Sequence, residues 1–167
     1  MISEIIRIKN LNSNLTDVKL IDLPKIEDPR GNLSIIEEEN HIPFKIERTY
    51  WIYDVPGGQV RGGHAFKNQQ EFIVALSGSF DVIVDDGKEQ KIYSLNRSYY
   101  GLYIPAGLFR QMENFSTNSL AIVLSSTAFS EDDYIRQYDD FLKYKDSHKV
   151  HVFQSNHEHA EETILIS

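Results

Sequence analysis

The sequence predicts an all-β protein, a jelly-roll barrel followed by a helix towards the C-terminal end. Three observations support this prediction. Between Thr49 and Ser126, short apolar stretches with a period of two are separated by turn residues. The chain has 167 residues, of which 41% are hydrophobic, and this is enough for one domain around one core. After Phe129 the pattern changes to one that is typical of a helix.

The expected strands follow one another along this central region. The clearest pair is a hairpin, in which residues 79–84 lead into a turn at 85–87 and residues 90–95 return beside them. The turn ends in Asp-Gly, which favours the positive φ angles of a tight hairpin. About eight strands suit a jelly roll. The other expected strands are residues 48–55, 59–66, 71–76, 99–104, 110–115 and 119–125.

A helix is expected after residue 130. Ser130 is followed by three acidic residues, which places a capping hydroxyl and negative charge at a helix start. Aromatic and aliphatic residues then recur at helical spacing, so this face is expected to pack on the barrel or on a partner rather than bind a cofactor. These residues are Tyr134, Tyr138, Phe141 and Leu142.

The domain division expected from these patterns has three parts: an N-terminal extension at 1–19, the barrel with its helix at 20–145, and a polar tail at 146–167. The tail contains scattered histidines without a fixed helical or hairpin frame. We therefore expect a solvated tail there rather than a metal site. The histidines are His148, His151, His157 and His159.

Composition excludes several classes of function. The chain has 17 Lys and Arg against 25 Asp and Glu, a net charge of −8, which disfavours contact with nucleic-acid phosphates. It has no cysteine, which fits the reducing cytoplasm. We find no export signal at the N-terminus and no apolar run of the ~18 residues that a membrane span needs, so neither export nor a membrane role is expected.

The central strands carry a motif that indicates a binding site. Gly58, His64, Phe66, Glu71 and Gly78 stand at the spacing of the first cupin motif, so the sequence resembles the cupin family. That family has a second histidine at the position of Phe66. Residues two apart on a strand share a face, so the side chains at 64 and 66 are expected to point into the barrel together.

The second cupin motif is also incomplete in this chain. Pro105 and Gly107 are present, but Arg110 stands where the family has a histidine. Only His64 and Glu71 remain of the usual metal ligands, and a site for iron, zinc or manganese needs about three. We therefore expect no metal and no metal-dependent oxygenase chemistry. A barrel mouth with these groups and a tyrosine suits proton transfer on an anionic or carbonyl substrate.

A more specific resemblance covers residues 20–144. The sequence resembles the dTDP-4-keto-6-deoxyglucose 3,4-ketoisomerases, which are metal-free, WxcM-like cupins. The segments that carry this resemblance occur in the same order here; they are residues 28–33, 42–48, 61–65, 84–87 and 133–141.

The resemblance implies a homodimer without a cofactor. It implies that a base removes the C3 proton of a dTDP-linked keto sugar and that an enediol is reprotonated at C4. Imidazole, with an ordinary pKa of ~6.5, suits this proton transfer. His64 is retained, but Phe66 replaces the family's second histidine, and Glu71 stands where the ketoisomerases usually have glutamine. The product of such an enzyme normally supplies an aminotransferase that makes a deoxyamino sugar for surface polysaccharide or lipopolysaccharide.

Candidate roles follow from this comparison. His64 is the expected catalytic base, assisted by Tyr50 and Glu71; an apolar neighbour such as Phe66 would raise the pKa of the Glu71 carboxyl. Arg61 is the first candidate to bind the diphosphate, because a guanidinium matches phosphate oxygens and the adjacent glycines permit close approach. The remaining expected substrate-binding residues are Arg48, Phe66, Arg97, Tyr103 and Arg110.

Three hypotheses stay open from the sequence. The first is an active 3,4-ketoisomerase that uses His64. The second is a related sugar-nucleotide epimerase or isomerase with altered chemistry, since removal of a proton beside a ketone begins all of these reactions. The third is a non-catalytic nucleotide-sugar-binding protein, in which Phe66 fills space and Glu71 forms a buried ion pair with Arg110.

Overall fold

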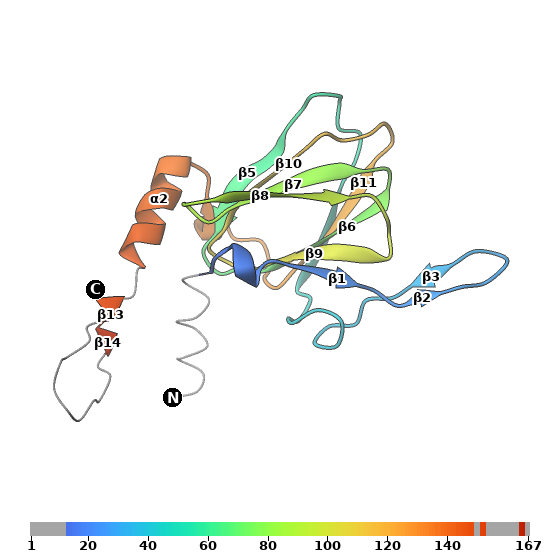
Figure 1. Cartoon of the computed structure of the whole chain (residues 1–167), viewed down its shortest axis with the longest axis horizontal. Helices are drawn as coiled ribbons and strands as arrows, with labels where there is room; N and C mark the ends of the chain where they lie inside the picture. The colour runs from blue at the N-terminus through green and yellow to red at the C-terminus, as the bar shows by residue number, and fades with distance from the viewer. Residues whose placement is uncertain (1–12, 149–150, 153–163, 166–167) are drawn as a thin grey trace.

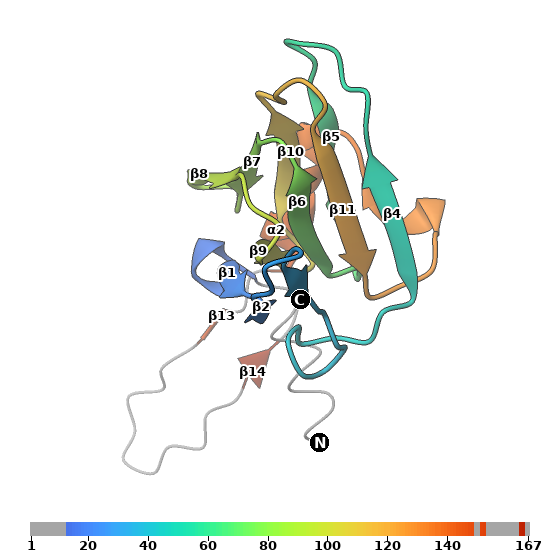
Figure 2. The same ribbon diagram turned by 90° about the vertical axis from the view of Figure 1, so that its right-hand side faces the viewer.

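The computed structural model describes residues 13–148, 151–152 and 164–165. Two five-stranded antiparallel sheets pack face to face (Figures 1 and 2), and this confirms the predicted jelly-roll barrel. The first sheet has the order β1 (Lys19–Asp22), β9 (Tyr100–Ile104), β6 (Glu71–Ser77), β11 (Leu120–Ser125) and β4 (Arg48–Ile52). The second has the order β12 (Tyr134–Ile135), β5 (Arg61–Phe66), β10 (Phe109–Glu113), β7 (Phe80–Asp85) and β8 (Gln90–Leu95).

The main core lies between the two sheets and follows the alternation of their strands. On β6, Ile73 and Ala75 face this core, whereas Phe72 and Val74 face a second cluster on the outer side of the same sheet. Both faces of β6 are therefore covered, and this explains why the first five residues of the strand are all buried. The second sheet contributes to the main core through Val82, Val84, Tyr93, Leu95 and Met112.

The segment before β4 covers the outer side of the first sheet. Ile42 and Phe44 are buried there against Phe72 and Leu124. Between β1 and this segment, β2 (Lys25–Ile26) and β3 (Leu33–Ser34) pair as a narrow arm that projects away from the barrel (Figure 1). A short 3-10 helix, η1 (Leu15–Asp17), precedes β1 and has a capping box formed by Asn14 and Asp17.

The C-terminal helix begins later than the sequence predicts. Residues Glu131–Asp133 form a 3-10 turn, η2, and the chain then enters β12, which pairs with β5. Ser130 makes no side-chain cap. The Asp133 carboxylate instead accepts hydrogen bonds from the backbone N–H groups of Asn68 (2.7 Å) and Gln69 (3.0 Å), which fixes this segment along the sheet edge.

The helix itself, α2 (Tyr138–Ser147), packs on the outer face of the second sheet, as Figure 1 shows. Phe141 is fully buried there with Phe109 and Leu142. The predicted packing of Phe141 and Leu142 on the barrel is confirmed, but Tyr134 belongs to a strand and not to the helix face. The pairing of an edge strand has outweighed the local helical pattern.

Two short strands are described beyond α2. Strands β13 (His151–Val152) and β14 (Ile164–Leu165) pair with each other. Residues 1–12 and the positions of His157 and His159 lie outside the described residues, so the division into 1–19, 20–145 and 146–167 stays a prediction. No helix in the described part of the chain is long and apolar enough to cross a membrane.

Candidate active site

A cavity of about 250 Å³ lies between β4, at the edge of the first sheet, and β5 and β12, at the edge of the second. Three arginines line it, together with aromatic groups and a single imidazole. The alternation of β4 explains part of this lining, since Arg48 and Tyr50 lie on the inward face of the strand. The lining residues are Arg48, Tyr50, Trp51, Ile52, Arg61, Gly62, His64, Arg110 and Tyr134.

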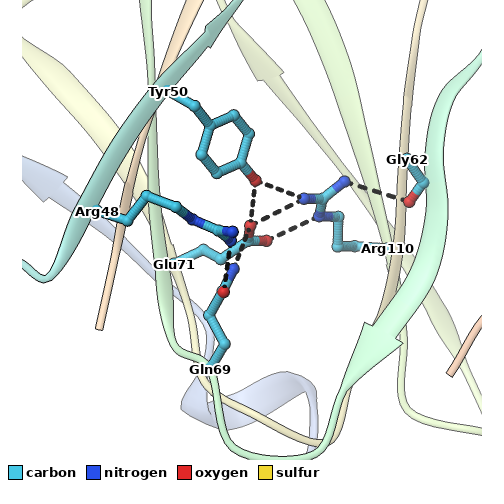
Figure 3. Close-up of polar contacts among 6 residues, drawn as sticks. All are labelled: Arg48, Tyr50, Gly62, Gln69, Glu71 and Arg110. Carbon is cyan, nitrogen blue, oxygen red and sulfur yellow. Dashed lines mark hydrogen bonds and ion pairs between the residues drawn. The ribbon is translucent and has the colours of Figure 1, made fainter. Parts of the chain in front are cut away.

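One wall of the cavity rests on a buried ion pair (Figure 3). Arg110 Nε donates to Glu71 Oε2 (2.8 Å) and Arg110 Nη2 donates to Glu71 Oε1 (2.9 Å), so the contact is bidentate. The two side chains are almost fully buried. Tyr50 joins the pair, because its hydroxyl donates to Glu71 Oε1 (2.6 Å) and accepts from Arg110 Nη2 (3.2 Å).

Two further side chains extend this network behind the ion pair. Gln69 Nε2 donates to Glu71 Oε1 (3.1 Å), and Gln69 Oε1 accepts from Arg48 Nη2 (2.8 Å), as Figure 3 shows. Glu71 and Arg48 lie on the two strands that flank β11. Both pair with Ser125 of β11, so they stand level with each other on the first sheet. The guanidinium of Arg48 also lies over the Tyr50 ring, 5.2 Å from its centroid.

Gly62 allows Arg110 to approach the backbone of β5. Arg110 Nη1 donates to the Gly62 carbonyl (3.2 Å), and Gly62 has a φ of +74°. A Cβ at this position would collide with Arg110 Nη1. Both the backbone conformation and the space therefore require glycine here.

The electrostatics of this wall favour fixed charges. Burial alone would raise the pKa of the Glu71 carboxyl, but the charge and hydrogen bonds of Arg110 lower that pKa below its usual value. The expected rise in the pKa of Glu71 beside Phe66 is therefore wrong, because the Arg110 guanidinium is bonded directly to the carboxylate. Burial, with the nearby Glu71 charge, raises the pKa of the Tyr50 phenol, which keeps its proton.

An aromatic wall, formed by His64, Phe66 and Tyr134, lies beside Arg110 on the second sheet. The His64 ring lies edge-on to Phe66, with centroids 4.8 Å apart, and 4.9 Å from the ring of Tyr134. Its Nε2 is buried and has no hydrogen-bond partner among the described residues. Burial, followed by the charge of Arg110, lowers the pKa of His64 to about 3, so the imidazole is neutral at physiological pH.

The structure gathers most of the residues expected at the site. Arg110 and His64 are cross-strand neighbours, side by side on β10 and β5. Phe66 is buried behind His64, and Arg61 lies on the lining of the cavity. Glu71 is enclosed by its partners and does not line the cavity, so it supports Tyr50 and Arg110 rather than facing a ligand.

Two of the expected substrate-binding residues lie elsewhere. The Tyr103 hydroxyl donates to Gln70 Oε1 (2.6 Å), and its ring packs with Phe44 on the outer face of the first sheet. Arg97 is exposed in the turn between β8 and β9, where its guanidinium donates to the Asn96 carbonyl (2.7 Å). Strand alternation places Leu102 and Ile104 inward, and Tyr103 must then point outward.

Sequence reasoning missed Tyr134 and Gln69 as parts of the site. The helical spacing predicts Tyr134 on a helix face, and β12 has two residues, too few to show a period. Gln69 lies two residues before Glu71, and this spacing was a usable signal that both side chains share one face.

The described residues contain no group of three or more His, Cys, Asp or Glu side chains that could hold a metal ion. His148 Nδ1 lies 2.7 Å from the Tyr144 carbonyl at the end of α2. The positions of the two missing cupin ligands hold Phe66 and Arg110, and neither side chain is a metal ligand.

Comparison with known proteins places this geometry in a family. Residues 16–146 match the family described as "FdtA: WxcM-like, C-terminal". A curated TDP-4-oxo-6-deoxy-alpha-D-glucose-3,4-oxoisomerase from Aneurinibacillus thermoaerophilus is 44% identical over 126 residues, which span 75% of this chain and 91% of the relative.

Solved structures agree with this match. A sugar 3,4-ketoisomerase from Thermoanaerobacterium thermosaccharolyticum, in complex with TDP, superposes with a TM-score of 0.78 at 35% identity over 80% of this chain and 98% of that one. The TDP-quinovose 3,4-ketoisomerase from Campylobacter jejuni has a TM-score of 0.74 at 40% identity over 77% of this chain and 99% of that one. The chain therefore belongs to the WxcM-like family of cupin-fold sugar-nucleotide isomerases.

Proposed function

We propose that this protein is a sugar-nucleotide 3,4-ketoisomerase that moves the ketone of dTDP-4-keto-6-deoxyglucose from C4 to C3. One observation carries the proposal. One cavity is lined by a neutral imidazole with an unpartnered ring nitrogen and, beside it on the neighbouring strand, by a guanidinium whose position is fixed by Glu71 and Tyr50. The names of the relatives agree with this chemistry.

The first step is removal of the C3 proton by His64. The neutral ring has a free electron pair that can accept this proton. The electron pair of the C3–H bond forms the C3=C4 double bond, and the carbonyl pair moves to O4. The free enzyme holds the pKa of His64 low, but bound phosphates and the developing negative charge on O4 favour the imidazolium. The anionic substrate therefore strengthens the base that acts on it.

The polar wall, formed by Tyr50, Glu71 and Arg110, stabilises the negative charge that develops on O4. Arg110 is permanently protonated, and its orientation is fixed by Glu71 and by the Gly62 carbonyl. Tyr50 helps to fix the same guanidinium, because its oxygen accepts from Arg110 Nη2 while its own proton is donated to Glu71. A donor that is already oriented in a water-poor site stabilises a developing oxyanion without reorganisation, and contributes typically ~10²–10³-fold in rate.

Two arginines at the cavity are suited to the diphosphate. Arg48 and Arg61 line the opening, and no ion pair engages either of them within the described residues. A guanidinium matches phosphate oxygens in shape and charge. These residues place local positive charge in a chain whose net charge is −8.

The protein is also proposed to act as a cytoplasmic homodimer that supplies an aminotransferase in deoxyamino-sugar synthesis for surface polysaccharide. Apolar side chains on the outer face of the first sheet support self-association: Trp51 is 60%, Tyr53 is 61% and Leu76 is 45% exposed. Light scattering that gives a monomer mass at micromolar concentration would contradict the dimer.

The activity is tested by proton NMR of dTDP-4-keto-6-deoxyglucose in deuterated water, with a metal chelator present throughout. We expect deuterium at C3 and accumulation of a 3-keto sugar. The His64→Asn variant should lose both signals. Exchange at another carbon would indicate altered chemistry, and thymidine line broadening without exchange would indicate a binding protein; either result contradicts the proposal.

A further inference from the structure

The proposed reaction needs a proton to leave C3 and another to arrive at C4. Phe66 occupies a position on the aromatic wall next to the base, and a phenyl ring carries no exchangeable proton. On the polar wall, the Tyr50 hydroxyl is already engaged by Glu71 and Arg110. Neither side chain is therefore free to deliver the second proton.

Tyr134 is a second hydroxyl-bearing side chain on the lining of the same cavity. On β12 it is directly opposite Phe66 of β5, and the two rings are 4.5 Å apart, edge to face. Its ring is 4.9 Å from that of His64, and it lines the same cavity. Its hydroxyl makes no hydrogen bond with any described residue, in contrast to that of Tyr50.

The ring of Tyr134 is well supported from behind. The Arg136 guanidinium lies over it, 4.3 Å from the centroid, and is itself paired with Glu131 at 2.8 Å. Phe129 adds a ring contact at 5.8 Å. These contacts hold the aromatic ring and leave its hydroxyl uncommitted, which is the arrangement expected of a residue that transfers a proton.

Resting on the proposed isomerase function, we propose that Tyr134 is a second catalytic acid–base residue, which delivers the proton to C4 after His64 has removed the one from C3. His64 passes its proton to O4, which completes the enediol. The Tyr134 phenol then protonates C4, using the electron pair of the C3=C4 bond. The O3–H electron pair forms the new C3=O bond, and the released O3 proton restores the phenol. The protein and the redox state of the sugar are unchanged at the end.

The two half-reactions can be separated in deuterated water. We expect Tyr134→Phe to keep exchange at C3 within about threefold of the unmodified protein, because His64 is untouched. Formation of the 3-keto sugar should fall by about 100-fold or more, within the range for loss of one acid–base group. Tyr138→Phe is the matched control. Tyr138 lies on α2, outside the cavity, and its hydroxyl donates to Asp85 at the end of β7, so loss of this hydroxyl should leave both rates unchanged.

A second variant tests whether proton transfer, rather than packing, is lost. The double variant Tyr134→Phe, Phe66→His places an imidazole next to the position of the lost hydroxyl. This imidazole can supply a proton to C4, so the double variant should recover at least part of the 3-keto product. Product formation by Tyr134→Phe at the original rate would overturn the role of Tyr134, as would an equal loss of C3 exchange and product. If the unmodified protein forms no 3-keto sugar, the isomerase proposal itself fails. That result differs from the two Tyr134→Phe outcomes, which overturn only the role of Tyr134.

Discussion

The two walls of the cavity treat their polar groups in opposite ways. On the polar wall, Tyr50, Glu71 and Arg110 are joined to one another by short hydrogen bonds. On the aromatic wall, His64 Nε2 and the Tyr134 hydroxyl have no partner among the described residues. Hydrogen bonding therefore fixes charge on the polar wall, whereas its absence leaves groups free to exchange protons on the aromatic wall.

The largest expected effect comes from removing the anion of the polar wall. Glu71→Ala leaves the Arg110 guanidinium buried, charged and without its carboxylate. Breaking one partner of a buried ion pair costs about 3–5 kcal/mol, because the remaining charge keeps its full desolvation penalty. We expect a loss of this size in the free energy of unfolding, measured by urea denaturation.

Glu71→Gln is the matched control, since it keeps the shape and one acceptor oxygen for Arg110. It should lose clearly less stability than the alanine variant. If both variants unfold at the urea concentration of the unmodified protein, the polar wall contributes nothing to the fold and the comparison between the walls fails.

The aromatic wall should make the free energy of unfolding depend on pH through His64. Burial and Arg110 lower the pKa of His64 to about 3, against 6.5 for a free imidazole. Between these values the unfolded chain binds a proton that the folded protein does not. The contribution of the neutral ring is therefore complete above about pH 6.5 and is lost as the pH falls towards 3, by at most ~1.4 kcal/mol per pH unit.

This dependence is measured as the difference between the unmodified protein and His64→Asn in urea denaturation from pH 7 to pH 4. The variant should have a shallower slope, because the other titrating groups are common to both proteins. Parallel curves would mean that the folded imidazole titrates normally, and the neutral state assigned to the base would be wrong.

The barrel could be predicted from the sequence because the alternation of apolar and polar residues within a strand shows which side chains face the core. On β8, Tyr93 and Leu95 alternate with Ser94, and this period of two places both in the core without knowledge of any partner strand. Family spacing also brought His64 and Arg110 to one site. The place of Tyr134 in the site could not be predicted in this way. Its strand, β12, is defined by pairing with β5 and by the hydrogen bonds of Asp133, which are contacts between distant parts of the chain.

A smaller effect should arise where the polar wall meets the backbone of β5. Gly62→Ala places a methyl group against Arg110 Nη1 and strains a φ of +74°, so the guanidinium must leave its hydrogen bond with the Gly62 carbonyl. Gly58 has a similar φ of +79° but open space around it. Both alanine variants carry the backbone strain, of order 1–2 kcal/mol.

The difference between these two variants isolates the displacement of Arg110. We expect Gly62→Ala to be less stable than Gly58→Ala by about 1 kcal/mol, the typical net contribution of one hydrogen bond, and to lose isomerase rate that Gly58→Ala keeps. Equal rates in the two variants would show that the orientation of Arg110 does not matter to the reaction.

The smallest effect is expected outside both walls. Arg97 was predicted to bind substrate, but it is exposed in the turn after β8 and bonds to the backbone of Asn96, whereas Arg61 lines the cavity. Arg61→Ala should raise KM by about tenfold through loss of one charge-assisted hydrogen bond, and Arg97→Ala should leave KM and kcat within about twofold. Because both substitutions remove one positive charge, long-range attraction of the substrate changes similarly in each. A KM increase for Arg97→Ala that matches the one for Arg61→Ala would therefore place part of the nucleotide beyond the cavity described by the two walls.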